Sequence, residues 1–229
     1  MIVAIHQPNF LPWLGYFHKM AVADHFILLD SVPFSKGSYT NRVQIKTVKG
    51  PTWLTVPVQT SGRLGQNIVD VLCDPNPAWR KKVIGSLENS YRQSPFFKTY
   101  AREIFDIILE AGDKLADLNI RLIDLIAGRL GIHTATTRSS AMQSRGHSTE
   151  LLIGLCRELG ADTYLSGSGG ASYQDEQAFA ATGIKVVYAQ YSHPMYPQPF
   201  GDFATGLSAI DLLFNCGPAA GDILGSRKQ

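Results

Sequence analysis

The sequence predicts an α/β fold: one domain over residues 1–229, built on a Rossmann-like, mainly parallel sheet, with a β-hairpin and a helical segment in the middle of the chain. Short apolar runs rich in β-branched residues occur at both ends of the chain, and polar loops and helical stretches follow them. Helical periodicity fills roughly residues 79–130. Of the 229 residues, 45% are hydrophobic and 17% are charged, which is enough apolar material for a sizeable core and argues against a disordered chain.

The first predicted strand ends in a polar loop that holds candidate site residues. Ile2 to Ile5 is an apolar run typical of a buried strand, and Pro8 ends it because proline lacks a backbone donor. Ligands of open α/β sheets bind outside the carboxyl ends of the strands, so we expect His6, Gln7 and Asn9 at a binding site. The alternative is that His6 and Asn9 only fix the turn through hydrogen bonds to the backbone. A helix is expected next, from the spacing of its apolar residues Trp13, Phe17 and Met20.

A second strand is predicted at His25 to Leu29, and Asp30 follows it directly. In a parallel sheet this carboxylate lies at the same edge as His6, which makes Asp30 a candidate catalytic residue. Capping of a helix or turn is its alternative role.

A β-hairpin is predicted near residues 43–58, because apolar and polar residues alternate on either side of the turn Gly50-Pro51. Asn41 and Arg42 lie just before it. The planar fork of arginine suits a phosphate or a carboxylate, so we expect both residues to contact a ligand. A solvated surface is the alternative for such a basic stretch.

The middle of the chain is predicted to be structural. A loop with one short strand, Ile68 to Leu72, leads into amphipathic helices between residues 79 and 130. Apolar stripes at helical spacing are usually core, and we expect little chemistry from this segment.

Polar strand ends return in the last third of the chain. A strand predicted to end near Leu165 is followed by Ser166, Gly167, Gly169 and Gly170, where glycines let backbone amides approach an anion, and Tyr173 begins the next expected helix. A steric need for glycine in the turn is the alternative. After another strand, Ile184 to Tyr188, come His193 and Tyr196, and a closing amphipathic helix is expected at Phe203 to Phe214. If the sheet is parallel, these loops converge with His6 on one pocket.

Composition and motif searches exclude several classes. A net charge of +2 does not favour nucleic acid or a membrane surface as partner. The three cysteines are widely spaced, no histidine has a close second and third ligand for zinc, and no apolar run is long enough to span a bilayer. The opening residues do not form a signal peptide. We therefore expect a soluble, cytoplasmic protein without a metal; the sequence identifies no cofactor.

The segment from His6 to Phe17, HQPNFLPWLGYF, resembles the opening signature of the WbqC-like protein family. The similarity continues nearly to the end of the chain, through Asn41-Arg42, Trp53 to Val58, Tyr164 to Gly167, His193-Pro194 and Asp211 to Asn215. The resemblance implies a link to bacterial O-antigen and other surface-polysaccharide gene clusters. It also implies a lysine soon after the paired glycines, whereas this chain has Ala171 and Ser172. If that lysine contacts a phosphate in relatives, this protein must use another cation.

Two functions are compatible with these residues. The first is a transferase acting on a nucleotide-activated or amino sugar precursor of a surface polysaccharide, with His6, His193 or Asp30 in catalysis and the other candidate residues in binding. The second is a non-catalytic protein that binds a small molecule in the same strand-end pocket. Turnover of a nucleotide sugar distinguishes them.

Overall fold

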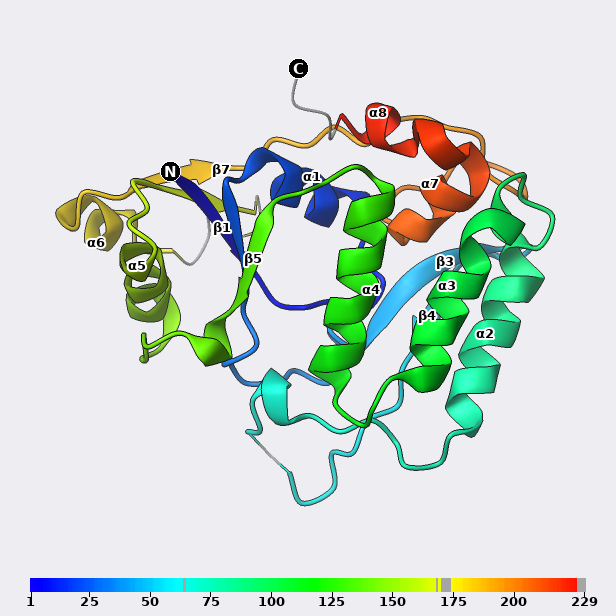
Figure 1. Ribbon diagram of the computed structural model, residues 1–229, viewed down its shortest axis with the longest axis horizontal. Helices are drawn as coiled ribbons and strands as arrows, with labels where there is room; N and C mark the ends of the chain where they lie inside the picture. The colour runs from blue at the N-terminus through cyan, green and yellow to red at the C-terminus, as the bar shows by residue number, and fades with distance from the viewer. Residues whose placement is uncertain (64, 168, 170–173, 226–229) are drawn as a thin grey trace.

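The computed structural model describes residues 1–63, 65–167, 169 and 174–225. Its centre is a five-stranded parallel sheet in the order β5-β2-β1-β6-β7 (Figure 1). The strands are β1 (Ile2–His6), β2 (His25–Leu28), β5 (Ala135–Arg138), β6 (Thr163–Ser166) and β7 (Lys185–Tyr188). From β1 the chain adds β2 and β5 on one side, then returns to add β6 and β7 on the other. The predicted Rossmann-like α/β fold is confirmed.

Strand β1 lies at the centre of this sheet and is covered on both faces. Val3 aligns with His25 of β2 on one side and with Tyr164 of β6 on the other. Because side chains alternate along a strand, Ala4 enters the larger hydrophobic core, whereas Val3 and Ile5 enter the smaller core on the opposite face. Burial on both faces explains why β1 is apolar from Ile2 to Ile5.

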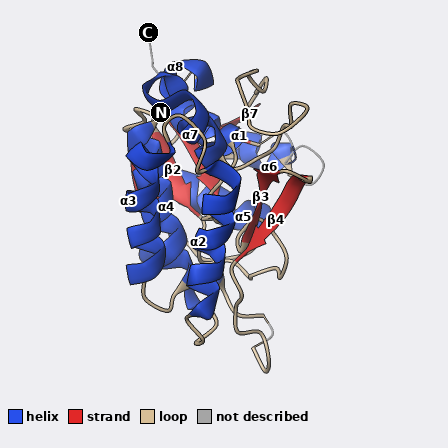
Figure 2. Cartoon of the chain, turned by 90° about the vertical axis from the view of Figure 1, so that its right-hand side faces the viewer, coloured by secondary structure: helices blue, strands red, loops and turns tan. Residues whose placement is uncertain are grey.

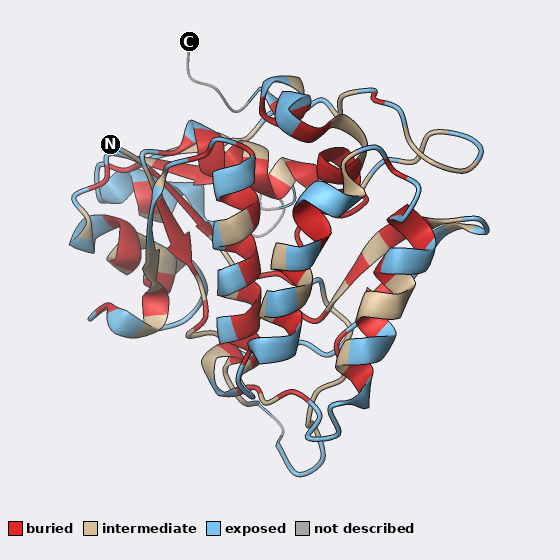
Figure 3. Ribbon diagram, turned by 45° about the vertical axis from the view of Figure 1, so that its right-hand side comes forward, coloured by how far each residue is buried: buried red, intermediate tan, exposed pale blue. Residues whose placement is uncertain are grey.

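Helices cover both faces of the sheet. The larger core is built with α1 (Leu14–Val22), α2 (Ala78–Tyr91), α3 (Phe97–Glu110), α4 (Leu115–Arg129), α7 (Ala209–Cys216) and α8 (Ala220–Leu224), and the short 3₁₀ helix η4 (Gly217–Ala219) joins α7 to α8. The smaller core is built with α5 (Ser148–Glu158) and α6 (Glu176–Ala181), and the short 3₁₀ helix η2 (Ser139–Ala141) precedes α5. The helices turn their buried sides inward and their exposed sides to solvent (Figure 3). Among the described residues, no helix is both long and apolar enough to cross a bilayer.

The predicted helical segment and hairpin are both confirmed. Helices α2, α3 and α4 account for the helical segment and lie side by side (Figure 2). The hairpin is a separate two-stranded sheet of β3 (Arg42–Thr47) and β4 (Gly50–Thr55), in which Thr47 pairs with Gly50. Gly50 has φ +89° at this tight turn, a conformation that favours glycine.

One predicted element is wrong, and the closing helix is confirmed with a later start than predicted. The segment from Ile68 to Leu72 is not a strand but begins with a short 3₁₀ helix, η1 (Ile68–Asp70). Its first amides donate to the carbonyl oxygens of Val32 and Asp30, so the apolar run packs against the loop after β2 instead of joining a sheet. The closing helix begins at Ala209, because Gly206 adopts φ +74° and the chain ahead of the helix is bonded to the hairpin.

Candidate functional site

A cavity of about 500 Å³ opens at the carboxyl ends of β1 and β6. These two strands flank the point where the chain reverses its direction across the sheet, which is where ligands bind in open α/β folds. His6 and Gln7 line the cavity from β1, and Ser166, Gly167 and Gly169 line it from β6. The structure therefore brings together two of the predicted loops, which lie some 160 residues apart in the sequence.

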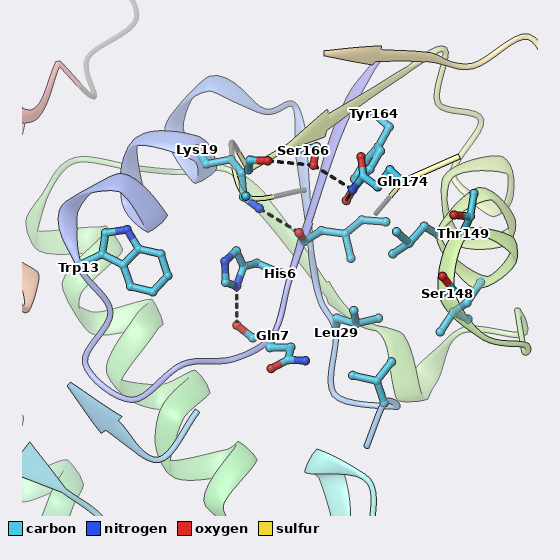
Figure 4. Close-up of a pocket in the computed structure, with 16 residues that line it drawn as sticks. His6, Gln7, Trp13, Lys19, Leu29, Ser148, Thr149, Tyr164, Ser166 and Gln174 are labelled. Atoms are coloured by element: carbon cyan, nitrogen blue, oxygen red, sulfur yellow. Dashed lines mark hydrogen bonds between the residues drawn. The ribbon is translucent and has the colours of Figure 1, made fainter. Parts of the chain in front are cut away.

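His6 is held in one orientation and one tautomer on this wall. Its Nδ1 lies 3.2 Å from the carbonyl oxygen of Gln7, and because a carbonyl only accepts, Nδ1 carries the proton (Figure 4). The lone pair is then on Nε2. Trp13 and Tyr16 pack edge-on against the imidazole, with centroids 5.6 and 4.9 Å away. Burial, with a smaller contribution from Lys19, lowers the pKa of His6 to about 3, so the ring is neutral at neutral pH.

Lys19 is a buried amine on the same wall, and sequence reasoning did not identify it. It is 3% exposed, and its Nζ donates to the carbonyl oxygen of Ile5 at 2.9 Å (Figure 4). No carboxylate of the described residues forms an ion pair with it. Burial lowers the pKa of Lys19 to about 7. The sequence feature that could have identified it is helical spacing: Lys19 follows Tyr16 by three residues in α1 and so lies on the same, buried side of the helix.

The end of β6 is fixed by a small hydrogen-bond group. Ser166 is 1% exposed, donates from Oγ to the carbonyl oxygen of Gly167 at 3.1 Å, and accepts from Nε2 of Gln174 at 2.9 Å. Oε1 of Gln174 is buried with no partner among the described residues. Ser148 and Thr149, in the first turn of α5, also line the cavity, and the hydroxyl of Thr149 accepts from the amide of Asp175, next to Gln174, at 3.4 Å. The predicted site residues Gly170 and Tyr173 lie outside the described residues.

Asp30 does not line this cavity. It is completely buried, and its carboxylate accepts hydrogen bonds from Nε of Arg138 at 2.7 Å, from the amide and hydroxyl of Ser140 at 2.8 and 2.9 Å, and from the hydroxyl of Ser139 at 3.2 Å. The carboxylate joins the end of β2 to the end of β5. This geometry supports the structural alternative for Asp30; its predicted catalytic role stays a prediction.

Asn9, Asn41 and Arg42 also lie outside the cavity lining. Asn9 is 3% exposed. Asn41 accepts from the amide of Gly37 at 3.2 Å and donates to the carbonyl oxygen of Val56 at 3.0 Å, so it connects the loop before β3 to the end of β4. Arg42 stacks on Trp53 at the hairpin surface. Ligand contacts by these three residues stay predictions.

His193 and Tyr196 belong to an aromatic cluster with Tyr191 and Phe203, apart from the cavity lining. Nδ1 of His193 lies 3.0 Å from the carbonyl oxygen of Pro194, the same device that fixes His6. Burial raises the pKa of Tyr196, and the nearby carboxylate of Asp211 raises it further. The structure thus gives His6, and not His193, the position beside the cavity.

Asn119 is a second residue that sequence reasoning missed, because it lies within the helical segment from which we expected little chemistry. It is completely buried in α4, and its Nδ2 donates to the carbonyl oxygens of Pro8 at 2.8 Å and Thr40 at 2.7 Å. The hydroxyl of Thr40 donates to Oε1 of Gln7 at 3.2 Å. Asn119 therefore holds the loop after β1 against the loop before β3. Among the described residues, no three His, Cys, Asp or Glu side chains gather as a metal site.

Comparison with known proteins gives a family but no described activity. The sequence pattern of the WbqC-like protein family matches residues 7–223. The chain is 38% identical over 224 residues to the uncharacterized protein Rv1507c of Mycobacterium tuberculosis (strain ATCC 25618 / H37Rv). The alignment covers 97% of this chain and 96% of that protein. No solved structure matches it.

Proposed function

This chain belongs to the WbqC-like protein family, and from that premise we propose that it is a transferase acting on a nucleotide-activated or amino sugar precursor of a bacterial surface polysaccharide. The observation that carries the proposal is Lys19, a buried amine on the wall of the strand-end cavity that has no acidic partner among the described residues. The polysaccharide pathway rests on the family resemblance. The kind of substrate is argued from the cavity.

An anionic group on the substrate would compensate the charge of the buried ammonium of Lys19. A buried ammonium is costly unless an opposite charge compensates it. Among the described residues, Lys19 has the carbonyl oxygen of Ile5 and the ring of Phe26, whose centroid lies 5.8 Å from Nζ, but no carboxylate. A phosphate bound in the cavity would restore the charged form of Lys19. Lys19 then serves as the cation that the chain lacks at Ala171 and Ser172, after the paired glycines. Backbone amides near Gly167 and the first turn of α5 support the same anion.

His6 supplies the base for transfer. Its neutral ring offers the Nε2 lone pair, and an anion bound beside it raises its pKa and so its basicity. In the proposed step, a hydroxyl or amine of the acceptor gives its proton to Nε2 as its oxygen or nitrogen bonds to the transferred group. The bond from that group to the phosphate-bearing leaving group breaks, and the leaving group takes the electron pair.

The test is ligand-induced thermal stabilisation with UDP-, GDP- and dTDP-sugars, followed by product analysis of any sugar that binds. A ligand at a hundred times its dissociation constant adds about 2.7 kcal/mol to the free energy of unfolding. We expect Lys19→Met to abolish this shift and Lys185→Met, an exposed lysine on β7, to retain it. Binding without product from any donor supports the non-catalytic alternative. No binding, or full binding by Lys19→Met, contradicts the proposal.

A further inference from the structure

We propose that Trp13, Tyr39, Trp53 and Arg42 form a second binding site, for a saccharide that carries a carboxylate or phosphate group. These four residues, called the aromatic row below, lead from the cavity to the hairpin surface. That this saccharide is the acceptor in the transfer rests on the proposed function, whereas its binding does not.

Arg42 is a positioned cation that has no anionic partner among the described residues. Its Cζ lies 4.2 Å from the centroid of the Trp53 ring, and the backbone of Gly37 is close enough that a Cβ there would be 3.7 Å from Cζ. Nε is buried without a partner, and Arg42 forms no ion pair or side-chain hydrogen bond with the described residues. A guanidinium held by stacking, with its donors unused, is suited to a bidentate carboxylate or phosphate.

The three rings are in contact with one another and partly open to solvent. Trp13 and Tyr39 have centroids 4.9 Å apart, and Tyr39 and Trp53 have centroids 5.7 Å apart. Tyr39 is 42% exposed and Trp53 is 40% exposed. The carbonyl oxygen of Tyr39 accepts from the amide of Phe10 at 3.0 Å, which holds the backbone of Tyr39 beside the loop after β1. Single exposed aromatics are ordinary, but three adjoining rings beside an arginine that has no ion pair among the described residues are not.

The spacing of the rings selects the ligand. Neighbouring rings already touch and are tilted by 51° and 58°, so a flat nucleobase has no gap to enter between them. A ligand must instead lie across their exposed surfaces. The C–H groups of a sugar ring suit the electron-rich aromatic faces, and its acidic group reaches Arg42. At the other end of the row, Trp13 lines the cavity and packs against His6 at 5.6 Å, so the two sites are continuous.

A neighbouring groove is the competing location for such a ligand. It has a volume of about 520 Å³ between β4 and α2, and both Trp53 and Trp79 line it. Trp79 is 7% exposed, and its indole N–H donates to the carbonyl oxygen of Asp74 at 3.2 Å. The chain has three tryptophans, and the indole N–H resonance of each one reports ligand binding at its own position, either in the aromatic row or in the groove.

The first experiment titrates the ¹⁵N-labelled protein with cellobiouronate, a glucuronate-containing disaccharide, and with cellobiose as its neutral counterpart. We expect the indole signals of Trp53 and Trp13 to shift with cellobiouronate while that of Trp79 stays in place. Joint shifts of Trp53 and Trp79 with Trp13 unchanged place the ligand in the groove and overturn the proposal. So does the absence of any shift.

The second experiment tests the arginine. Arg42→Gln should weaken cellobiouronate binding by about tenfold or more, the size of a lost charge-assisted hydrogen-bond pair, with little change for cellobiose. Arg42→Lys keeps the charge without the fork and should show most of that loss, and Lys49→Gln, on the turn of the same hairpin, should show none. Equal binding by Arg42→Gln and the unmodified protein overturns the assignment. Lys19→Met should still bind cellobiouronate. The proposed anion site at Lys19 and the proposed saccharide site at the aromatic row can therefore fail independently.

Discussion

The burial of Lys19 predicts how the free energy of unfolding depends on pH, and this dependence can be measured without a substrate. Burial lowers its pKa from 10.5 to about 7 in the folded protein, whereas in the unfolded chain it returns to its ordinary value. Below about pH 7 both states carry the proton, and the folded state bears the full cost of a desolvated ammonium. Between the two pKa values only the unfolded state holds the proton, so the free energy of unfolding rises with pH.

The magnitude follows from the same two values. Each unit of pKa difference corresponds to about 1.4 kcal/mol, so complete deprotonation of folded Lys19 relieves roughly 5 kcal/mol. From about pH 6 to about pH 9, the relief is roughly 3 kcal/mol by linkage. Lys19→Met has no such group, since methionine fills a similar volume without titrating. His6 is neutral in the folded protein over this range, and its titration in the unfolded chain is common to both proteins, so it cancels in their difference.

The assay is urea denaturation of the unmodified protein and Lys19→Met at several pH values across that range. The difference between their unfolding free energies cancels the other titrating groups. We expect the unmodified protein to gain roughly 3 kcal/mol relative to the variant as the pH rises. A pH-independent difference would refute the reasoning, because it would mean that Lys19 is charged and solvated. Lys185→Met, at an exposed position, should give the flat profile.

Three further predictions concern other parts of the structure. His6→Asn retains a donor for the carbonyl of Gln7 but lacks Nε2, so turnover should fall by about a hundredfold or more with binding retained; unchanged product formation contradicts the role of base. Asp30→Ala leaves buried donors unpaired and should lower the free energy of unfolding by roughly 3–5 kcal/mol in urea titrations. The control Asp117→Ala removes a half-exposed carboxylate and should lower it by less than about 1 kcal/mol; equal losses would show that Asp30 is not a structural centre. Gly217→Ala should lower the melting temperature, because Gly217 has φ +56° and a Cβ there would overlap the ring of Phe96; an unchanged melting temperature contradicts this packing.

The local pattern of the sequence predicted most of the fold. Period-two alternation around Gly50-Pro51 predicted the hairpin, and buried apolar runs followed by helical stretches predicted the parallel sheet. These features depend on nearest neighbours along the chain, which the sequence displays directly. The run from Ile68 to Leu72 shows the limit, since a short apolar segment fits a strand or a turn packed against another loop.

The sequence also placed His6 and Ser166 at strand ends, and a parallel sheet brings such ends to one edge. It did not decide which strand-end groups are already bonded within the protein. Asp30 takes its partners from residues 108 to 110 positions away, and Lys19, read along the chain, is an ordinary lysine in an amphipathic helix. Burial, hydrogen-bond partners and pKa depend on groups that are distant in sequence and adjacent in space. Only the tertiary structure therefore distinguished the carboxylate of Asp30, which is buried and hydrogen-bonded, from the amine of Lys19, which lies at the cavity without a carboxylate partner among the described residues.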